Sequence, residues 1–291
     1  MTAKYLLPED WLAKISRFQV ATASKLRGQH KGSHRSQRFG ASLDFSDFRE
    51  YHLGDDVRQV DWNVFARTDK YFIKRFLDEQ EMRVHILLDA TKSMGQHAKW
   101  LFARQIVASL GLMVLGRDDR LSFSFVQDEV KPPFRRKGTM YRRAFLQLVT
   151  DIEEANYSNR FAKDALKALP KDSTVLFIVT DGLEPIEEWE QLLKRLPRYA
   201  GDVRILQIVT QEELSPNYSG DVRLLDRETG NDVNVTMSSK VLESYHARRI
   251  LHEEEFEAIC RRFGVRKLQL KVEDGLQHAI FQQLLKAHWI R

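Results

Sequence analysis

The sequence contains one cysteine, Cys260, among its 291 residues. A single thiol cannot form a disulfide within the chain, nor can it build the thiolate cluster of a structural zinc site. We expect Cys260 to be a core residue of a helix. No run approaches the roughly 18 apolar residues that a membrane-spanning helix needs, and the segment "MTAKYLLPEDWLAK" lacks the apolar centre of a signal peptide. These absences predict a cytoplasmic protein without a transmembrane segment.

Sequence patterns of common enzymes are also scarce. The chain has no glycine-rich phosphate loop and no nucleophile-elbow serine, so neither a nucleoside triphosphatase nor a serine hydrolase is indicated. Its nine histidines form no pair at metal-ligand spacing beside an acid. Apolar residues make up 43% of the chain, which is enough for a sizeable core at this length.

Positive charge is concentrated in one segment. The net charge is +5, and residues 25–40, "KLRGQHKGSHRSQRFG", contain basic residues and histidines but no acid. A solvated loop or a docking site for an acidic protein surface fits this composition. The segment does not favour nucleic acid as a partner, because no aromatic side chains that could stack on bases are interleaved with the basic ones.

The order of the elements predicts an α/β fold. Apolar strands are expected at 83–88, 174–180, 203–209 and 266–272. Helices are expected at 94–115, 185–196, 238–263 and 275–288. Between them we expect a hairpin-like pair at 120–126 and 129–134, a helix from 139, a helical run at 159–169, and a polar hairpin with its turn at Thr229-Gly230-Asn231. Apolar strands that alternate with helices imply a doubly wound, mainly parallel sheet with helices on both faces.

The first part of the chain has a different character. We expect a helix over 8–24, then the basic loop, then a small β-rich subdomain, which together make an N-terminal region of residues 1–82 before a main domain at 83–291. The segment "GDDVRQVDW" contains Asp55, Asp56, Arg58, Asp61 and Trp62. We interpret it as a structural clasp of turn, ion pairs and a packed tryptophan rather than as a catalytic group.

Oxygen-bearing side chains follow two of the predicted strands. Asp89, Thr91 and Ser93 stand at alternate positions after the strand at 83–88, and Asp181 follows the strand at 174–180. Ligands of such sheets bind at the carboxyl ends of the strands, so the two acids converge if the strands are neighbours. The same residue types are also favoured helix N-caps, and the triplet alone could simply start a helix.

Thr139 is a further candidate, because it follows Gly138 at the start of a predicted helix. Hydroxyls and carboxylates without cysteine or histidine favour a hard cation, Mg²⁺ or Mn²⁺ rather than Zn²⁺. We therefore predict a metal site formed by Asp89, Thr91, Ser93, Thr139 and Asp181.

The motif Asp89-x-Thr91-x-Ser93, the Gly-Thr pair at Thr139 and the Thr-Asp-Gly at Asp181 resemble the metal-ion-dependent adhesion site of von Willebrand factor A domains. The resemblance covers about residues 83–210 and implies a von Willebrand factor A-like fold. Thr91 stands where that motif usually has serine, but it keeps the hydroxyl. Lys92, between two predicted ligands, is expected to point away from the metal, since an inward ammonium could replace the ion.

Longer segments of the sequence point to a more specific family resemblance. "GSHRSQRFGASLDFSDFREYHLGDDVRQVDWNVFARTDKYFIKRF", "LLDRETG" and "CRRFGV" are similar to the bacterial domain-of-unknown-function-58 family. The resemblance implies association with a MoxR-type AAA+ ATPase. We expect a metal-dependent interaction module, without catalytic residues, that accepts an acidic side chain of this or another partner. The alternative is a metal-dependent hydrolase that uses the same ion to activate water, with Asp181 as the evident spare carboxylate.

Overall fold

The computed structural model describes residues 6–22, 45–76, 81–117, 119–126, 132–152, 160–216, 218, 220–225 and 232–291. The chain divides into two compact units. The larger unit contains Met1–Lys25 and Met82–Arg291, and the smaller contains Leu26–Glu81. The predicted basic loop at 25–40 and the turn at Thr229-Gly230-Asn231 lie outside the described residues.

The larger unit is built on a six-stranded sheet with the order β10-β7-β6-β3-β4-β5. Its strands are β3 (Arg83–Leu88), β4 (Arg120–Phe125), β5 (Phe134–Lys137), β6 (Ser173–Thr180), β7 (Ala200–Val209) and β10 (Arg266–Lys271). All neighbouring strands are parallel except β4 and β5, which are antiparallel. The prediction of a mixed α/β protein with a mainly parallel central sheet is confirmed.

Both faces of this sheet are buried. Ile86 and Leu88 belong to one apolar core, whereas Leu87, which points to the opposite face, belongs to another. Phe177 and Ile178 of β6 alternate in the same way. Because successive side chains of a strand face opposite sides, a sheet covered on both faces needs apolar residues at every position. This requirement explains the continuous apolar runs by which the strands are recognised in the sequence.

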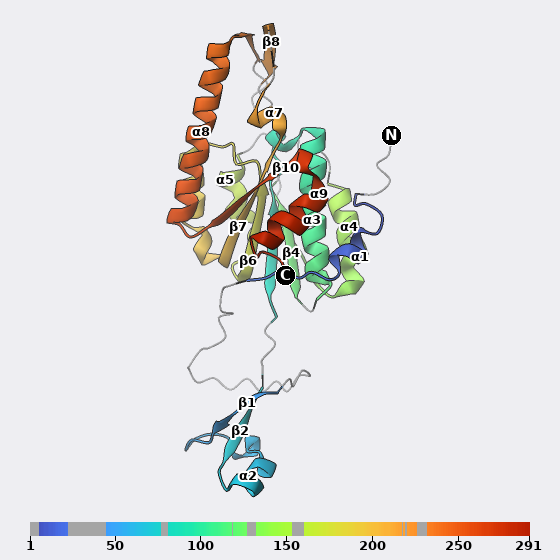
Figure 1. The fold of residues 1–291 in the computed structure, drawn as a ribbon, viewed down its shortest axis with the longest axis vertical. Coiled ribbons are helices and arrows are strands. Elements are labelled where there is room, and N and C mark those ends of the chain that lie inside the picture. The colour runs from blue at the N-terminus through green and yellow to red at the C-terminus, as the bar shows by residue number, and fades with distance from the viewer. Residues whose placement is uncertain are drawn as a thin grey trace. The chain divides into compact units, whose positions relative to one another are not determined.

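The helices flank the sheet on its two sides (Figure 1). Their bounds are α3 (His97–Leu115), α4 (Arg142–Thr150), α5 (Phe161–Asp164), α6 (Ile186–Leu193), α7 (Gln211–Leu214), α8 (Ser239–Arg262) and α9 (Gly275–His278). Shorter 3-10 turns are η2 (Lys92–Met94), η3 (Thr139–Tyr141) and η4 (Ala165–Ala168), and a π-helical segment, η7 (Ala279–Leu284), continues α9. Side chains of α3, such as Trp100, pack in the first core, while Trp189 of α6 and Phe256 of α8 pack in the second.

The N-terminal segment differs from the prediction. The helix expected over 8–24 is limited to α1 (Trp11–Ile15). Beyond it the chain is extended, because its backbone pairs with the C-terminus: the amide of Gln19 donates to the carbonyl of Arg291 at 2.9 Å, and Val20 forms a bridge with Ile290. Residues 6–22 therefore belong to the larger unit, not to a separate N-terminal region.

Two predicted hairpins are present with shifted bounds. The strand that pairs with β4 begins at Phe134, where the expected one ended. The polar hairpin consists of β8 (Gly220–Leu225) and β9 (Asp232–Met237), which are antiparallel.

The smaller unit contains a two-stranded antiparallel sheet of β1 (Phe45–Glu50) and β2 (Phe72–Phe76) with helix α2 (Trp62–Thr68). The expected clasp is present in part. Asp55 forms an ion pair with Arg49 at 2.6 Å, and Asp61 caps α2 by accepting from the amide of Asn63. The tryptophan is not packed as expected, because Trp62 is 57% exposed.

By length and composition, α3 is apolar enough to cross a membrane, and it is the one such helix among the described residues. In the structure 78% of this apolar window is buried inside the protein, as expected for a core helix of a globular domain. Cys260 is buried on α8, which confirms its predicted place in a helix core, and burial raises the pKa of its thiol to about 12.

Candidate functional site

The two acids of the predicted site leave adjacent strands at the same edge of the sheet. Asp89 follows Leu88, the last residue of β3, and Asp181 follows Thr180, the last residue of β6. These strands are parallel neighbours with Leu88 opposite Val179, and the amide of Asp89 donates to the carbonyl of Val179 at 2.9 Å. The register thus brings both buried carboxyl groups to one place.

Asp89 organises the loop that follows it. Its Oδ1 accepts hydrogen bonds from the amide of Thr91 at 3.0 Å and from the Thr91 hydroxyl at 2.6 Å. The Thr91 hydroxyl lies 3.1 Å from the Ser93 hydroxyl. Asp89 and Thr91 are buried, whereas Ser93 is partly exposed. Three of the five predicted ligands therefore form one connected group that opens toward solvent at Ser93.

This group does not cap a helix. Helix α3 begins at His97 with Gln96 as its N-cap and no side-chain cap hydrogen bond. The 3-10 turn η2 has Thr91 at its N-cap position, again without a side-chain cap bond. The simpler interpretation of "DATKS" as a helix start therefore does not describe what these side chains do.

Thr180 is a member of the site that sequence reasoning missed. Its hydroxyl donates to Asp89 Oδ2 at 2.6 Å and accepts from the amide of Gly182 at 3.1 Å. The signal was present, since a threonine directly precedes Asp181 at the end of an apolar strand. Thr180 belongs to the Thr-Asp-Gly motif, of which only Asp181 was assigned to the site.

The environment of Asp89 disfavours a negative charge. Burial, and then the nearby charge of Asp181, raise the pKa of Asp89 to about 7, although hydrogen bonds from Thr180 and Thr91 act in the opposite direction. A buried acid that resists ionisation beside a second acid is the arrangement that a bound cation would relieve.

Lys99 is the second residue that sequence reasoning missed. It lies in the first turn of α3, and its side chain is fully buried. Its Nζ donates to Asp181 Oδ2 at 2.9 Å, to Glu213 Oε1 at 2.6 Å and to the carbonyl of Ser93 at 3.5 Å. Burial by itself lowers the pKa of Lys99, but the charges of Asp181 and Glu213 outweigh it, and the pKa lies above its usual value. The lysine that points into this site is thus Lys99, which stands six positions after Ser93.

Glu213 is held at the site by its own helix. It forms a capping box with Thr210: the amide of Glu213 donates to the Thr210 hydroxyl at 3.2 Å, and the amide of Thr210 donates to Glu213 Oε2 at 2.9 Å. The other carboxylate oxygen is free to accept from Lys99. Glu213 thereby connects α7, which follows β7, to the same edge of the sheet.

Thr139, the remaining predicted ligand, has no hydrogen bond to the other four predicted ligands among the described residues. It is exposed at the start of η3, after β5. Its role as a fifth ligand stays a prediction.

The donor set suits a hard cation in its chemistry. The ligands would be carboxylate and hydroxyl oxygens. Within the described ranges no group of three or more His, Cys, Asp or Glu side chains could hold a metal ion, so the hydroxyls of Thr91 and Ser93 would have to complete the site. The hydroxyls of Thr91 and Ser93 are 3.1 Å apart. This separation is close to the roughly 2.9 Å between neighbouring ligands of an octahedron with Mg²⁺–oxygen bonds of about 2.05 Å. The residues present therefore fit Mg²⁺ or Mn²⁺.

A pocket of about 310 Å³ adjoins the site on the side of α8. Asp181 and Glu213 line it together with apolar side chains and two arginines of α8, Arg248 and Arg249. Neither arginine forms a hydrogen bond or ion pair with another described residue. Three acids line the pocket as well, namely Asp181, Glu213 and Glu253. Lys99 pairs with the first two and Lys267 with the third, so Arg248 and Arg249 are the basic side chains of the described lining that have no ion pair.

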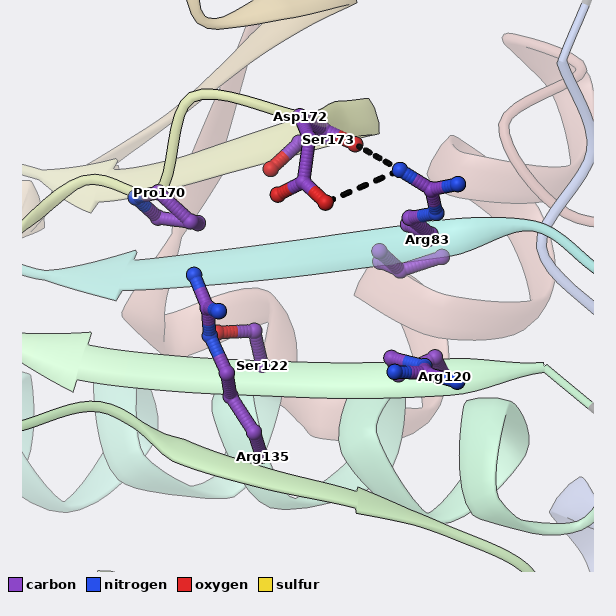
Figure 2. Close-up of a pocket in the computed structure, with 8 residues that line it drawn as sticks. Arg83, Arg120, Ser122, Arg135, Pro170, Asp172 and Ser173 are labelled. Carbon is purple, nitrogen blue, oxygen red and sulfur yellow. Dashed lines mark hydrogen bonds and ion pairs between the residues drawn. The ribbon is translucent and has the colours of Figure 1, made fainter.

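A second, smaller cavity lies at the opposite edge of the sheet, where the parallel strands begin (Figure 2). Arg83 and Arg120, the first residues of β3 and β4, line it with Arg135 of β5. Arg83 is paired with Asp172 at 2.8 Å. The cavity has a volume of about 40 Å³, which is room for water molecules. We therefore assign the candidate site to the carboxyl edge, where ligands of such sheets bind.

The chain is similar to several known proteins. It is 23% identical over 193 residues to the uncharacterized proteins Rv1480 of Mycobacterium tuberculosis and Mb1516 of Mycobacterium bovis, an alignment that covers 63% of this chain. The chain spans 61% of the length of these relatives.

Two solved structures are also similar. Protein BatB from Bacteroides thetaiotaomicron is 16% identical with a TM-score of 0.39, covering 70% of this chain and 98% of that one. An aerotolerance-related membrane protein from Bacteroides fragilis is 16% identical with a TM-score of 0.40, covering 70% and 99%. The profile of the family described as "Protein of unknown function DUF58" matches residues 47–255, and the chain belongs to this family.

Proposed function

We propose that this protein is a von Willebrand factor A-like, metal-dependent interaction module, and that a Mg²⁺ ion at the Asp89–Ser93 loop accepts an acidic side chain of a partner protein. The observation that carries the proposal is the arrangement around Asp89. The buried Asp89 carboxylate holds the Thr91 hydroxyl, which lies 3.1 Å from the Ser93 hydroxyl, close to the spacing of neighbouring Mg²⁺ ligands. The Ser93 side chain is partly exposed, so a partner can reach it from solvent.

Each residue has a distinct part in this scheme. Thr91 and Ser93 would bind the ion directly through their hydroxyls. Asp89 and Asp181 would balance its charge, partly through water, since Mg²⁺ usually keeps several waters. Thr180 would orient Asp89 through its hydrogen bond. When bound, the ion supplies positive charge and an open coordination position.

The pocket beside the site gives the partner a surface to bind. Arg248 and Arg249 would attract an acidic segment, and the apolar lining, which includes Leu183 and Tyr245, would bury its neighbouring side chains. Charge complementarity of this kind steers association and suppresses wrong partners. By the family resemblance, the partner we propose is a MoxR-type AAA+ ATPase, and the complex would form in the cytoplasm.

The alternative, a metal-dependent hydrolase, gains no specific support. It needs a carboxylate free to take a proton from water, and Asp181 was the evident candidate. Its Oδ2 already accepts from the Lys99 ammonium at 2.9 Å, and its Oδ1 accepts from the amide of Leu183 at 3.2 Å, so both oxygens are engaged within the protein. We therefore favour binding over catalysis.

The proposal is tested by direct binding of the purified protein to the MoxR-type ATPase of the same organism, by biolayer interferometry with ATP, ADP or no nucleotide. Because the ATPase itself needs Mg²⁺, the control is the variant Ser93→Ala rather than removal of the metal. We expect binding in at least one nucleotide state and a loss of about tenfold or more in affinity for Ser93→Ala. No association in any nucleotide state with Mg²⁺ present, or equal binding by Ser93→Ala, contradicts the proposal.

A further inference from the structure

Lys99 is a basic residue in the first turn of α3, where acidic residues are usually preferred. The first turn of a helix favours acidic side chains, because the helix dipole is positive there. In α3 that turn contains no acid, and Lys99 within it is fully buried. A buried ammonium persists only where anions compensate its lost hydration. The compensation must therefore come from outside the helix.

The compensating groups come from the loops that follow three adjacent strands. Asp181 follows β6, Glu213 lies on α7 after β7, and the Ser93 carbonyl belongs to the loop after β3. The loops after β3 and β6 also carry the candidate metal ligands Asp89, Thr91, Ser93 and Asp181. The Lys99 ammonium thus stands beside the place where a divalent ion would be held, and it already binds one of the predicted ligands, Asp181.

We infer that Lys99 is a resident cation of this site, which holds Asp181 in the absence of metal and which a divalent ion must displace from that carboxylate in order to bind. The inference rests on the proposed metal site. Its consequence is that Lys99 weakens metal binding. The protein would then load and release its ion over a range of Mg²⁺ concentrations instead of holding it permanently.

The exchange is feasible because Lys99 has a second anchor. When Asp181 turns to the metal, Glu213 still accepts from Lys99, and its other oxygen is fixed by the amide of Thr210. The ammonium is therefore never left buried without an anion. Glu213 is also 29% exposed, so its own carboxylate remains partly hydrated.

The test is a calorimetric titration with Mg²⁺, supported by thermal unfolding with Mg²⁺ and with EDTA. Lys99→Gln keeps hydrogen-bond donors but removes the charge, and we expect it to bind Mg²⁺ about tenfold more tightly than the wild type. The matched control is Lys267→Gln. Lys267 is another largely buried lysine, paired with Glu253, that does not contact Asp181. It should change the affinity far less.

A second variant, Glu213→Gln, keeps the inference testable if Lys99→Gln does not fold. Glu213→Gln leaves Lys99 charged but removes its alternative anion, so Lys99 should hold Asp181 more firmly and Mg²⁺ should bind more weakly. A lysine with only a structural role would not make the two variants change affinity in opposite directions. Should Lys99→Gln fail to fold, Mg²⁺ binding by Glu213→Gln as tight as that of the wild type overturns the inference.

The outcomes separate this inference from the proposed metal site. Tighter binding by Lys99→Gln than by a wild type that binds Mg²⁺ supports both. Equal or weaker binding by Lys99→Gln overturns the role of Lys99 while the metal site stands. If Lys99→Gln binds Mg²⁺ and the wild type does not, the inference that Lys99 competes with the ion is supported, but the proposal that the wild type functions through a bound metal is contradicted. Absence of binding in both proteins contradicts both ideas.

Discussion

The hydroxyl of Thr180 donates a hydrogen bond of 2.6 Å to Asp89 Oδ2, and it thereby joins the ends of strands β6 and β3. Both side chains are buried. The same hydroxyl accepts from the amide of Gly182, so its proton is directed toward Asp89. Asp89 is therefore oriented from both sides, by Thr91 through Oδ1 and by Thr180 through Oδ2.

Thr180→Val should destabilise the protein. Valine keeps the shape of threonine but leaves the buried Asp89 oxygen without its donor, which should cost about 1–3 kcal/mol in the free energy of unfolding. Urea denaturation at pH 8 without metal measures this cost. Thr174→Val is the matched control, because Thr174 lies near the start of the same strand and, among the described residues, its hydroxyl accepts a hydrogen bond from the exposed amide of Arg83 alone. Equal losses in the two variants would show that the Asp89 hydrogen bond has no special weight.

The larger features of the fold could be predicted because they depend on local patterns. The strand at 83–88 is found at its expected residues, since a strand buried on both faces leaves an uninterrupted apolar run. The helix expected over 8–24 failed for the opposite reason. Its residues are compatible with a helix, but their backbone pairs with residues near position 290, and this contact has no local signature.

The site was predictable only where its residues are close in sequence or follow strand ends. Asp89, Thr91 and Ser93 are spaced two residues apart, and Asp181 directly follows the neighbouring strand. Lys99 and Glu213 could not be found in this way. They are 114 positions apart, and their pairing depends on how α3 and α7 sit on the finished sheet. The sequence also placed Thr139 with the site, and its exposed position leaves that assignment a prediction.

Ser93→Ala should abolish the response to Mg²⁺ while leaving the stability of the metal-free protein nearly unchanged. The Ser93 hydroxyl is partly exposed, and its one hydrogen bond among the described residues is with Thr91. Without metal, the substitution should change the free energy of unfolding by no more than about 0.5–1 kcal/mol. In contrast, the increase in melting temperature on adding Mg²⁺ should be lost. Differential scanning fluorimetry with Mg²⁺ and with EDTA measures both, and an undiminished response to Mg²⁺ would remove Ser93 from the ligand set.

His85 should make stability depend on pH. The side chain is fully buried in β3, and its Nε2 lies 2.9 Å from the Ser124 hydroxyl. Burial, with a smaller effect of the Arg135 charge, lowers the pKa of His85 from 6.5 to about 3. Between these values the unfolded chain binds a proton that the folded protein does not. Stability should therefore fall as the pH decreases below 6.5, by about 1.4 kcal/mol per pH unit from this residue.

The variant His85→Gln isolates this effect, because glutamine can still reach Ser124 but does not titrate. Urea denaturation of both proteins at pH 8, 6 and 5 gives the difference in stability at each pH. The wild type should lose about 2 kcal/mol relative to the variant between pH 8 and pH 5. A constant difference across this range would mean that His85 is not held neutral in the folded protein.

Asp89→Asn distinguishes a metal ligand from a purely structural acid. Asparagine keeps an oxygen that can accept from the amide of Thr91, so the loop should retain its shape. Without metal, the change removes a buried acid that is disfavoured by burial and by the charge of Asp181. The NH₂ that replaces Oδ2 cannot accept from the Thr180 hydroxyl, and this loss offsets part of the relief. We therefore expect the metal-free variant to be about as stable as the metal-free wild type at pH 8. Mg²⁺ at about ten times its dissociation constant should then stabilise only the wild type, by about 1.4 kcal/mol.

A structural acid would behave differently: Asp89→Asn would lower the free energy of unfolding equally with Mg²⁺ and with EDTA. Thr91→Ser retains the hydroxyl and should therefore still be stabilised by Mg²⁺. If Mg²⁺ did not stabilise Thr91→Ser, the geometry of the loop would matter more than the identity of the ligand atoms.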